Sequence, residues 1–383
     1  MSLGNHPARR LRLGMVGGGQ AGNIGISHRT AALMDGRWDL VAGALSRDPD
    51  RARASAADWL IAPDRAYAGY AEMAEAEAAR PDRIDAVTIC TPNSSHHEIA
   101  LAFLRQGFHI ICDKPLTTSL DKAAELVAAT QAAGVIFAVT HTYSGFPMVR
   151  MAREMIANKE LGQIRSCAVE YVSQYQTELG NPDDWQNDPE ISGPLGVVAG
   201  TGTHAHHLAE FVTGLRVTEL SADLATLVPD HRLDDHASMH LRFENGARGH
   251  LWNTTIAPGN ENGLSIRVYG SKGGLRWHQE HPNQLYYTPL NAQTVILSRG
   301  GFQQTRAARA WTRVPSGSPE GYLEAFANLY SEIAEAILAH QAGGAPHQWL
   351  FPTVQDGARG VRFMFAALAS SQDGSRFVPL PSS

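Results

Sequence analysis

A glycine run near the start of the chain has the spacing of a phosphate-binding loop. Gly17, Gly19 and Gly22 match the pattern G-x-G-x-x-G and directly follow the apolar run 11–16. Such a loop turns sharply and lets backbone N–H groups approach a pyrophosphate at the positive end of the next helix. A purely structural glycine turn is the alternative, but a strand before the loop and a helix after it favour binding. The residues expected to contact a dinucleotide here are Gly17, Gly19, Gln20, Ala21 and Gly22.

The end of the second predicted strand bears on which dinucleotide binds. NAD sites usually place a carboxylate there for the ribose 2′-hydroxyl, whereas NADP sites prefer an arginine beside a small neutral residue. Here Ser46 and Arg47 follow the run 39–45. We therefore expect NAD(P), with a slight lean to NADP. The alternative is that Arg47 is solvated and Asp48 only caps the next helix.

A group of histidines lies in the stretch 200–207, which reads GTGTHAHH. Histidine exchanges protons near neutral pH, so this stretch is a candidate for acid–base chemistry. Zinc is the alternative, because His204 and His207 would share one face of a helix. No H-E-x-x-H motif, cysteine pair or well-spaced third ligand accompanies them, so we expect no metal.

The elements around these residues alternate between short apolar strands and helix-like stretches as far as residue 141. Strands that are apolar throughout are expected where helices cover both faces of a sheet. The alternation predicts an α/β Rossmann domain, with a doubly wound parallel sheet. The predicted strands are 11–16, 39–45, 85–90, 109–113 and 135–140, and the predicted helices are 24–34, 50–59, 70–79, 95–106 and 120–133.

After His141 the pattern changes to segments in which apolar and polar residues alternate. This period of two, with a hairpin turn at Asn245-Gly246, predicts an α+β domain with a large open, mainly antiparallel sheet. The alternating segments are 164–175, 217–228, 237–256, 264–277 and 284–290, with helices at 148–158, 322–340 and 353–370. We expect a nucleotide-binding domain at 1–145 and a substrate-binding and oligomerisation domain at 146–383, whose C-terminal helices pack back against the first.

Composition and charge limit the classes of partner. The chain has 383 residues and a net charge of −6, so bulk electrostatics attract neither nucleic acid nor an anionic membrane. No apolar stretch approaches the roughly 20 residues that span a bilayer, and the run 11–16 is too short for a secretory signal. Three scattered cysteines, Cys90, Cys112 and Cys167, are typical of buried thiols in a reducing compartment. We expect a cytoplasmic protein.

Two further motifs complete a recognisable set. Thr91-Pro92-Asn93 and Asp113-Lys114-Pro115 end two of the predicted strands. With the glycine loop, Leu161-Gly162-Gln163-Ile164 and the segment around His204, they resemble the Gfo/Idh/MocA oxidoreductases, the family of glucose–fructose oxidoreductase and inositol dehydrogenase, over essentially the whole chain. The resemblance implies NAD(P)-dependent hydride transfer to or from a secondary hydroxyl or ketone of a sugar, polyol or glycoside. It implies that the cofactor site includes Thr91, Pro92, Asn93, His96, Asp113 and Lys114; the adjacent His97 is expected to be exposed.

The resemblance also implies roles for Lys114 and His204. A fixed ammonium at Lys114 would stabilise the alkoxide character that forms as hydride leaves an alcohol, and a structural lysine in a salt bridge is the alternative. His204 occupies the general acid–base position, and His207 occupies a position that often contacts substrate.

The chain departs from the family pattern at Gly200, where an aspartate is usual. Three interpretations remain open. Lys114 and His204 suffice; another carboxylate replaces the aspartate; or the chain is a dinucleotide-binding relative with weakened or no turnover, such as a sensor or partner subunit. The candidate carboxylates are Glu170, Asp183 and Asp184.

Tyr143 and Trp185 are further candidates for the substrate site. Tyr143 follows the last Rossmann strand, and Trp185 lies in the long polar stretch 174–192; long ordered loops are often functional. A packing role and a surface excursion are the respective alternatives. Asp234-Asp235-His236 looks like a solvated strand entry. An uncovered apolar sheet face usually finds a partner, and the family's sheets pack together, so we expect a homodimer or homotetramer through the open sheet.

Overall fold

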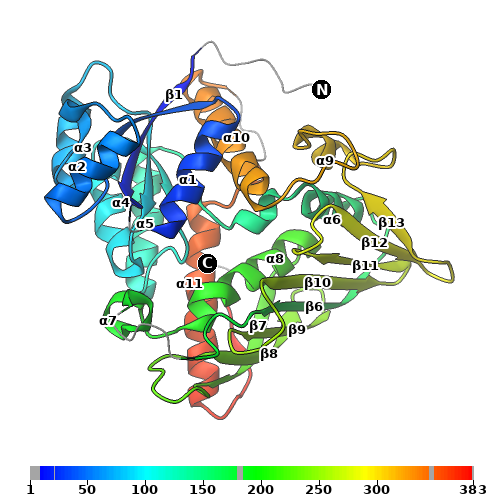
Figure 1. Cartoon of the computed structure of the whole chain (residues 1–383). Helices are drawn as coiled ribbons and strands as arrows, with labels where there is room; N and C mark the ends of the chain where they lie inside the picture. The colour runs from blue at the N-terminus through cyan, green and yellow to red at the C-terminus, as the bar shows by residue number, and fades with distance from the viewer. Residues whose placement is uncertain (1–8, 21, 179–183, 345–348, 382–383) are drawn as a thin grey trace. The chain divides into compact units, whose positions relative to one another are not determined.

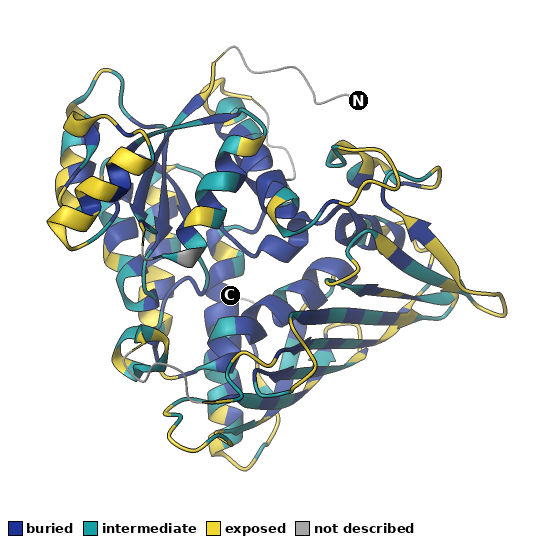
Figure 2. Cartoon of the chain, viewed as in Figure 1, coloured by how far each residue is buried: buried dark blue, intermediate teal, exposed yellow. Residues whose placement is uncertain are grey.

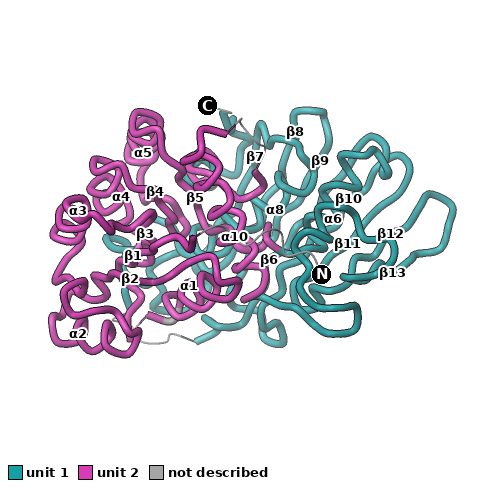
Figure 3. The backbone as a smooth tube through the Cα atoms, turned by 90° about the horizontal axis from the view of Figure 1, so that it is seen from above, with its two compact units in different colours: residues 1–2, 146–322, 359–383 teal, residues 3–145, 323–358 magenta. Residues whose placement is uncertain are grey.

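The computed structural model describes residues 9–20, 22–178, 184–344 and 349–381. Contacts between Cα atoms divide the chain into two compact units (Figure 3). Residues 3–145 and 323–358 form the Rossmann unit, and residues 146–322 and 359–383 belong to the sheet unit. Residues 323–358 thus group with the nucleotide-binding fold although they come late in the chain.

The Rossmann unit contains a parallel five-stranded sheet with the order β2-β1-β3-β4-β5. Its strands are buried along most of their length because helices lie against them, and this explains why they are apolar throughout. The predicted doubly wound sheet is confirmed. The strands are β1 (Leu11–Gly17), β2 (Trp38–Ala44), β3 (Ala86–Cys90), β4 (His109–Cys112) and β5 (Phe137–Val139).

The helices of this unit begin and end within two residues of their predicted limits. Two of them, α3 (Tyr70–Ala79) and α5 (Leu120–Ala133), match the prediction at both ends, and Gly134 with φ of 63° ends α5 in the left-handed conformation that favours glycine. The others are α1 (Asn23–Met34), α2 (Pro49–Asp58), α4 (His96–Leu104) and, from the C-terminal part, α10 (Tyr322–Gln341).

The sheet unit contains a nine-stranded sheet with the order β13-β12-β11-β10-β6-β9-β8-β7-β14 (Figure 1). All its strand pairs are antiparallel except β6 with β9. The predicted turn at Asn245-Gly246 joins β8 to β9, with Gly246 at φ of 86°. The strands are β6 (Ile164–Val172), β7 (Val217–Ala225), β8 (His236–Phe243), β9 (Arg248–Thr254), β10 (Gly263–Gly270), β11 (Gly273–His278), β12 (Gln284–Pro289), β13 (Val295–Ser298) and β14 (Val378–Pro379).

Helices α6 (Pro147–Ala157) and α8 (Thr203–Thr213) cover one face of this sheet. Side chains such as Val169, Leu251 and Ile266 point to that face and are fully buried. Buried residues therefore alternate with less buried ones along central strands such as β8, and Figure 2 shows this as dark blue and teal bands across the middle of the sheet. The remaining helices of this part of the chain are α7 (Pro189–Ser192), α9 (Arg306–Ala310) and α11 (Val354–Gln372), the last of which begins in the Rossmann unit.

The opposite face of the sheet is not the uncovered apolar surface expected from the sequence. It is polar rather than apolar: the His240 and His250 rings lie 5.7 Å apart, Arg276 lies over the Tyr286 ring, and Arg242 pairs with Glu219. The physical reason is the period of two itself, because strands that bury every second residue place their polar residues on the other face. Within the part of the chain that the structure describes, no helix is both long enough and apolar enough to cross a bilayer.

Candidate active site

The glycine loop between β1 and α1 has a backbone that only glycine fits. Gly17 and Gly18 have φ of 80° and 71°, in the left-handed region. A Cβ atom on Gly17 would lie 2.6 Å from Cγ2 of Thr91, and one on Gly25 would lie 2.0 Å from the carbonyl oxygen of Gly18. Helix α1 therefore starts in close contact with the loop. Gly25 was not singled out from the sequence, although a glycine in the first turn of a helix is a usable signal.

The loop leaves a cradle suited to an anionic group. Helix α1 has no acidic residue in its first turn, so no side chain of its own competes for the positive end of the helix. This fits the phosphates of a dinucleotide. Helix α2 holds Gln20 in place: the backbone N–H of Gln20 donates to Oγ of Ser55 (3.0 Å), and its side-chain amide donates to Asp58 (2.5 Å). Ala21, also predicted to bind the cofactor, lies outside the described residues.

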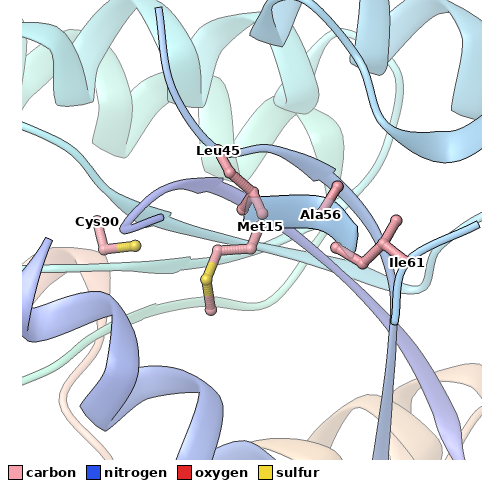
Figure 4. Packing of buried hydrophobic residues seen from close by; sticks show 5 residues of the cluster. All are labelled: Met15, Leu45, Ala56, Ile61 and Cys90. Atoms are coloured by element: carbon pink, nitrogen blue, oxygen red, sulfur yellow. The ribbon is translucent and has the colours of Figure 1, made fainter. Parts of the chain in front are cut away.

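A buried apolar cluster supports this loop from β1, β3 and α2. Figure 4 shows its members, which are Met15, Leu45, Ala56, Ile61 and Cys90. Cys90, Cys112 and Cys167 are all buried and form no disulfide, as predicted. Burial raises the pKa of each of the three thiols, so they stay protonated and take no part in nucleophilic chemistry.

The segment after β2 has no carboxylate at the position of Ser46. Ser46 is half-buried and its Oγ accepts a hydrogen bond from the N–H of Asp48 (3.1 Å), whereas Arg47 is exposed. The Asp48 side chain accepts from the N–H of Arg51 (2.9 Å) and caps α2. The helix-capping role considered for Asp48 is thus confirmed.

His96 joins two of the motif-bearing strand ends. It is fully buried, with Nδ1 2.9 Å from the carbonyl oxygen of Pro115 and Nε2 2.8 Å from that of Thr91. Burial lowers the pKa of this imidazole. Both ring nitrogens thus meet the protein backbone, which gives His96 the function of holding the two loops together. His97 is not exposed as expected: its side chain is only 13% accessible, and Nε2 lies 2.8 Å from Glu125.

Asp113 and Lys114 follow β4 directly. The Asp113 carboxylate accepts hydrogen bonds from the N–H of Lys114 (2.9 Å) and from Oγ1 of Thr140 (2.8 Å). Burial raises the pKa of Asp113, but the His28 ring, 4.0 Å away, and the Lys114 ammonium outweigh it and hold the pKa well below its usual range. Burial also lowers the pKa of Lys114, and the Asp113 carboxylate opposes that shift. Lys114 is half-buried, and its peptide bond to Pro115 is cis.

A buried polar network behind Asp113 was not found from the sequence. Nδ1 of His28 lies 2.8 Å from the Tyr330 hydroxyl, which lies 2.9 Å from Oγ1 of Thr88. His28, Thr88 and Tyr330 are fully buried. The network connects α1, β3 and α10 to the strand end that carries Lys114. A lone helical histidine gave no signal, because its partner Tyr330 is 302 residues away in the sequence.

In the sheet unit, His204 lies on α8 just after a π-helical turn at Val198–Gly202. Its side chain is buried, and its ring centroid is 6.2 Å from that of Tyr171 on β6. Asn253 holds the turn, because its amide donates to Oγ1 of Thr201 (2.7 Å) and to the carbonyl oxygen of Tyr171 (3.0 Å). Single π turns inside helices are frequent at functional sites.

Buried ion pairs anchor α8. Glu210 pairs with Arg359 (2.6 Å) and accepts from the N–H of Val217 (2.7 Å). Burial raises the pKa of Glu210, but His206 and Arg359 outweigh it and hold the pKa far below its usual range. The His206 ring stacks on Phe363 with centroids 4.3 Å apart. His206 therefore contributes to packing, whereas His204, two residues earlier on α8, lies beside Tyr171.

Asp234 and Asp235 correct another expectation, since neither is a solvated strand entry. Asp234 accepts hydrogen bonds from the N–H groups of Gly196 (2.6 Å) and Val198 (3.0 Å), at the start of the helical segment. Burial raises its pKa. Asp235 is buried and accepts from the N–H groups of Leu227 and Val228. Asp234 thus holds the backbone that leads to His204, whereas Asp235 holds the loop at Leu227 and Val228.

Two carboxylates considered as replacements for an aspartate at position 200 point elsewhere. Glu170 neighbours Tyr171 on β6 and so faces the other side of the sheet, where it pairs with Arg267. Asp184 is exposed and caps the short helical turn at Trp185–Asn187. Asp183 lies outside the described residues.

The remaining predicted substrate residues fall on separate elements. Trp185 is half-buried, His207 stacks on Phe211 with centroids 5.7 Å apart, and Tyr143 is buried in a helical turn at Thr142–Gly145. Among the described residues, no group of three or more His, Cys, Asp or Glu side chains is placed to hold a metal ion.

Comparison with known proteins agrees with this geometry. A family model for oxidoreductases with an NAD-binding Rossmann fold matches residues 11–141, and one for the GFO/IDH/MocA C-terminal domain matches residues 149–276. An uncharacterised oxidoreductase, YfiI of Bacillus subtilis, is 32% identical over 97% of both chains.

Solved structures cover nearly all of the chain. An oxidoreductase from Sinorhizobium meliloti is 44% identical, with a TM-score of 0.89 over 97% of this chain and 99% of its own. An inositol dehydrogenase homologue from Azotobacter vinelandii, solved with NAD+, is 34% identical, with a TM-score of 0.92 over 97% of this chain and 98% of its own. On the strength of its motifs, its fold and these matches, the chain belongs to the GFO/IDH/MocA family of NAD-binding oxidoreductases.

Proposed function

We propose that the protein is an NAD(P)-dependent dehydrogenase or reductase acting on a secondary hydroxyl or ketone of a sugar, polyol or glycoside. The observation that carries this proposal is the Asp113-Lys114 pair at the carboxyl end of β4. The same unit contains the loop after β1, whose backbone only glycine residues can adopt. Open α/β sheets bind ligands at this end of their strands. The Azotobacter homologue, solved with NADH and myo-inositol, supports a polyol-like substrate.

The bound nicotinamide would supply the hydride acceptor or donor. Lys114 would hold the reacting oxygen and stabilise its negative charge, because an ammonium in a desolvated site acts more strongly than in water. The Asp113 carboxylate opposes the lowering of the Lys114 pKa by burial and fixes the Lys114 backbone. His204 would accept the hydroxyl proton during oxidation and return it during reduction. Tyr143, Trp185 and His207 would line the substrate site.

The cofactor contacts would come from the glycine loop and from Thr91, Pro92, Asn93 and Asp113. His96, which was expected to line the cofactor site, is fully buried and would act only by holding the loops at Thr91 and Pro115 in place. Ser46 and Arg47 favour acceptance of NADP beside NAD, because Ser46 leaves room for a 2′-phosphate and the exposed Arg47 can pair with it. We also propose a cytoplasmic homodimer or homotetramer assembled through the open face of the sheet. That face would then meet its copy mainly through Arg, His and aromatic side chains, which interfaces favour over lysine.

A dinucleotide-binding protein without turnover is the second candidate, and Gly200 favours it. The test follows the absorbance of reduced nicotinamide while a panel of polyols, sugars and glycosides is offered with NAD or NADP. Turnover with at least one neutral polyol or sugar is expected. Cofactor binding without turnover on any member of the panel would favour the second candidate.

A further inference from the structure

The position of the missing aspartate is not crowded. Gly200 lies in the π-helical turn before α8 and is half-buried. Among the described residues, the neighbour that a Cβ atom built there would meet within 4 Å is the hydroxyl oxygen of Tyr175, at 3.9 Å. The phenol group of Tyr175 thus reaches the place from which a side chain at position 200 would extend. Both residues belong to the sheet unit.

The segment that carries Tyr175 is pinned on both sides. Oε1 of Gln174 accepts a hydrogen bond from the N–H of Gly259 (2.8 Å). Oε1 of Gln176 accepts from Oγ1 of Thr255 (2.8 Å), and its backbone N–H donates to the carbonyl oxygen of Thr255 (3.0 Å). These bonds fix the register of the segment after β6, so the direction of the Tyr175 side chain between the two glutamines is set by the fold.

The same turn places position 200 near the proposed acid–base residue. Gly200 and His204 are four residues apart, and side chains at that spacing are neighbours on a helix. The His204 ring already contacts Tyr171, which stands four residues before Tyr175 on the same continuous segment. Tyr175 is nevertheless 57% exposed. The phenol of Tyr175 is thus exposed, held by its flanking residues, and close to the turn that leads to the buried His204. These properties are typical of a residue that contacts a ligand rather than of a core residue.

We propose that Tyr175 is a substrate-binding residue whose hydroxyl takes the part of the carboxylate missing at position 200. The proposal rests on the proposed function, since it needs a hydroxylated substrate next to His204. A phenol hydroxyl both donates and accepts hydrogen bonds, whereas a carboxylate only accepts. Tyr175 would orient the reacting hydroxyl towards His204 and stay protonated throughout, with no bond made or broken on it.

Tyr175→Phe removes only the hydroxyl and tests this proposal. Turnover of the best substrate from the polyol and sugar panel is compared in the wild type, Tyr175→Phe and the control Tyr70→Phe. Tyr70 is a half-buried tyrosine at the start of α3, to which no part of the proposed site is assigned. We expect kcat/KM to fall about tenfold in Tyr175→Phe, the value of one lost hydrogen bond, and to stay unchanged in Tyr70→Phe. The Kd for the dinucleotide and the Tm stay constant, which a merely structural role would not produce.

Gly200→Asp completes a double-mutant cycle, because a Cβ atom at position 200 approaches no described atom outside its own helix more closely than 3.9 Å. In the presence of Tyr175→Phe, Gly200→Asp should restore part of the lost kcat/KM. If the wild type turns over and Tyr175→Phe matches it, the inference is wrong and the proposed function stands. If the wild type is inactive and Gly200→Asp alone creates activity, the phenol does not replace the carboxylate. Inactivity of both on the whole panel removes the proposed function and the inference together.

Discussion

The hydroxyl of Tyr330 lies 2.8 Å from Nδ1 of His28, although the two residues are 302 positions apart. Tyr330 comes from α10, and His28 comes from the helix that follows the glycine loop. The pair completes the Rossmann unit behind Asp113. Helix α10 thereby contributes to the strand end that carries Lys114, and not only to the outer surface of the unit.

Tyr330→Phe should destabilise this unit. The substitution leaves the buried ring of His28 and the hydroxyl of Thr88 without the partner that they share, which costs about 1–3 kcal/mol. Urea unfolding should show the loss as a lower midpoint. Tyr286→Phe is the control: its hydroxyl bonds Gln284 near the protein surface, and its loss should change the unfolding free energy by less than about 0.5 kcal/mol. Equal midpoints for both variants would show that the buried network adds no stability.

Gly25→Ala should weaken dinucleotide binding at least about tenfold, equivalent to 1.4 kcal/mol. The new Cβ atom would lie 2.0 Å from the carbonyl oxygen of Gly18, and backbone atoms on both sides must then move apart. Gly69→Ala is the matched control, because no atom of another described residue, its chain neighbours aside, lies within 4 Å of its Cβ position. Calorimetric titration with NAD and NADP measures both. An unchanged Kd for Gly25→Ala would mean that the close approach of α1 to the loop is not needed for binding.

The Glu210–Arg359 pair should make stability depend on pH in one direction. The pKa of Glu210 is lower in the folded chain than its ordinary value of 4.5. The pair therefore stabilises the fold fully above pH 4.5, and this contribution is lost as the pH falls below that value. Arg359→Met should cost about 1–3 kcal/mol at neutral pH, because it removes two hydrogen bonds from the buried Glu210 carboxylate and leaves it with Arg216 and His206.

The free energy of unfolding, measured from neutral pH down to pH 4, checks this prediction. The wild type should lose more stability over that range than Arg359→Met does. Arg376→Met, which removes an exposed pair with Asp373, should behave like the wild type. Parallel pH curves for the wild type and Arg359→Met would contradict the role given to the buried pair.

Ser46→Asp should shift the cofactor preference towards NAD. A carboxylate at the end of β2 can accept from the ribose 2′-hydroxyl but repels a 2′-phosphate. We expect kcat/KM with NADP to fall about tenfold or more, while the value with NAD is kept or rises. Asp50→Ser, an exposed change in the first turn of α2, serves as a control for general charge effects. If the ratio of the two cofactors is the same in wild type and Ser46→Asp, the preference is set elsewhere.

Much of the Rossmann unit could be predicted because its signals are local. Apolar strands, the glycine loop and the strand-end motifs lie within short windows of sequence, and β1 to β5 follow the predicted runs closely. The turn at Asn245-Gly246 could be predicted for the same reason, because its signal is a pair of adjacent residues. The short edge strands β13 and β14 were missed, because strands of four and two residues give too little alternation to recognise.

The expectations that the structure corrects have a common physical cause: each residue contacts a partner that is distant in the sequence. Asp234 was expected in solvent, but the N–H groups that bury it come from Gly196 and Val198. His97 was expected to be exposed, but Glu125 covers it from α5. The helix α8 was not predicted either, since the glycines and histidines around His204 have weak helix propensity and its anchor, Arg359, comes from α11. In each case tertiary contacts override the local preference.

Deuterium transfer tests the central claim most directly, because it reports hydride transfer itself. A substrate deuterated on the carbon that bears the reacting hydroxyl is incubated with oxidised NAD or NADP and the protein, and the reduced cofactor is analysed by mass spectrometry. The account predicts deuterium in the cofactor with the wild type, at least about a hundredfold slower transfer with Lys114→Met, and wild-type transfer with the exposed control Lys122→Met. Transfer at the same rate with Lys114→Met, or none with the wild type on any substrate of the panel, would contradict it.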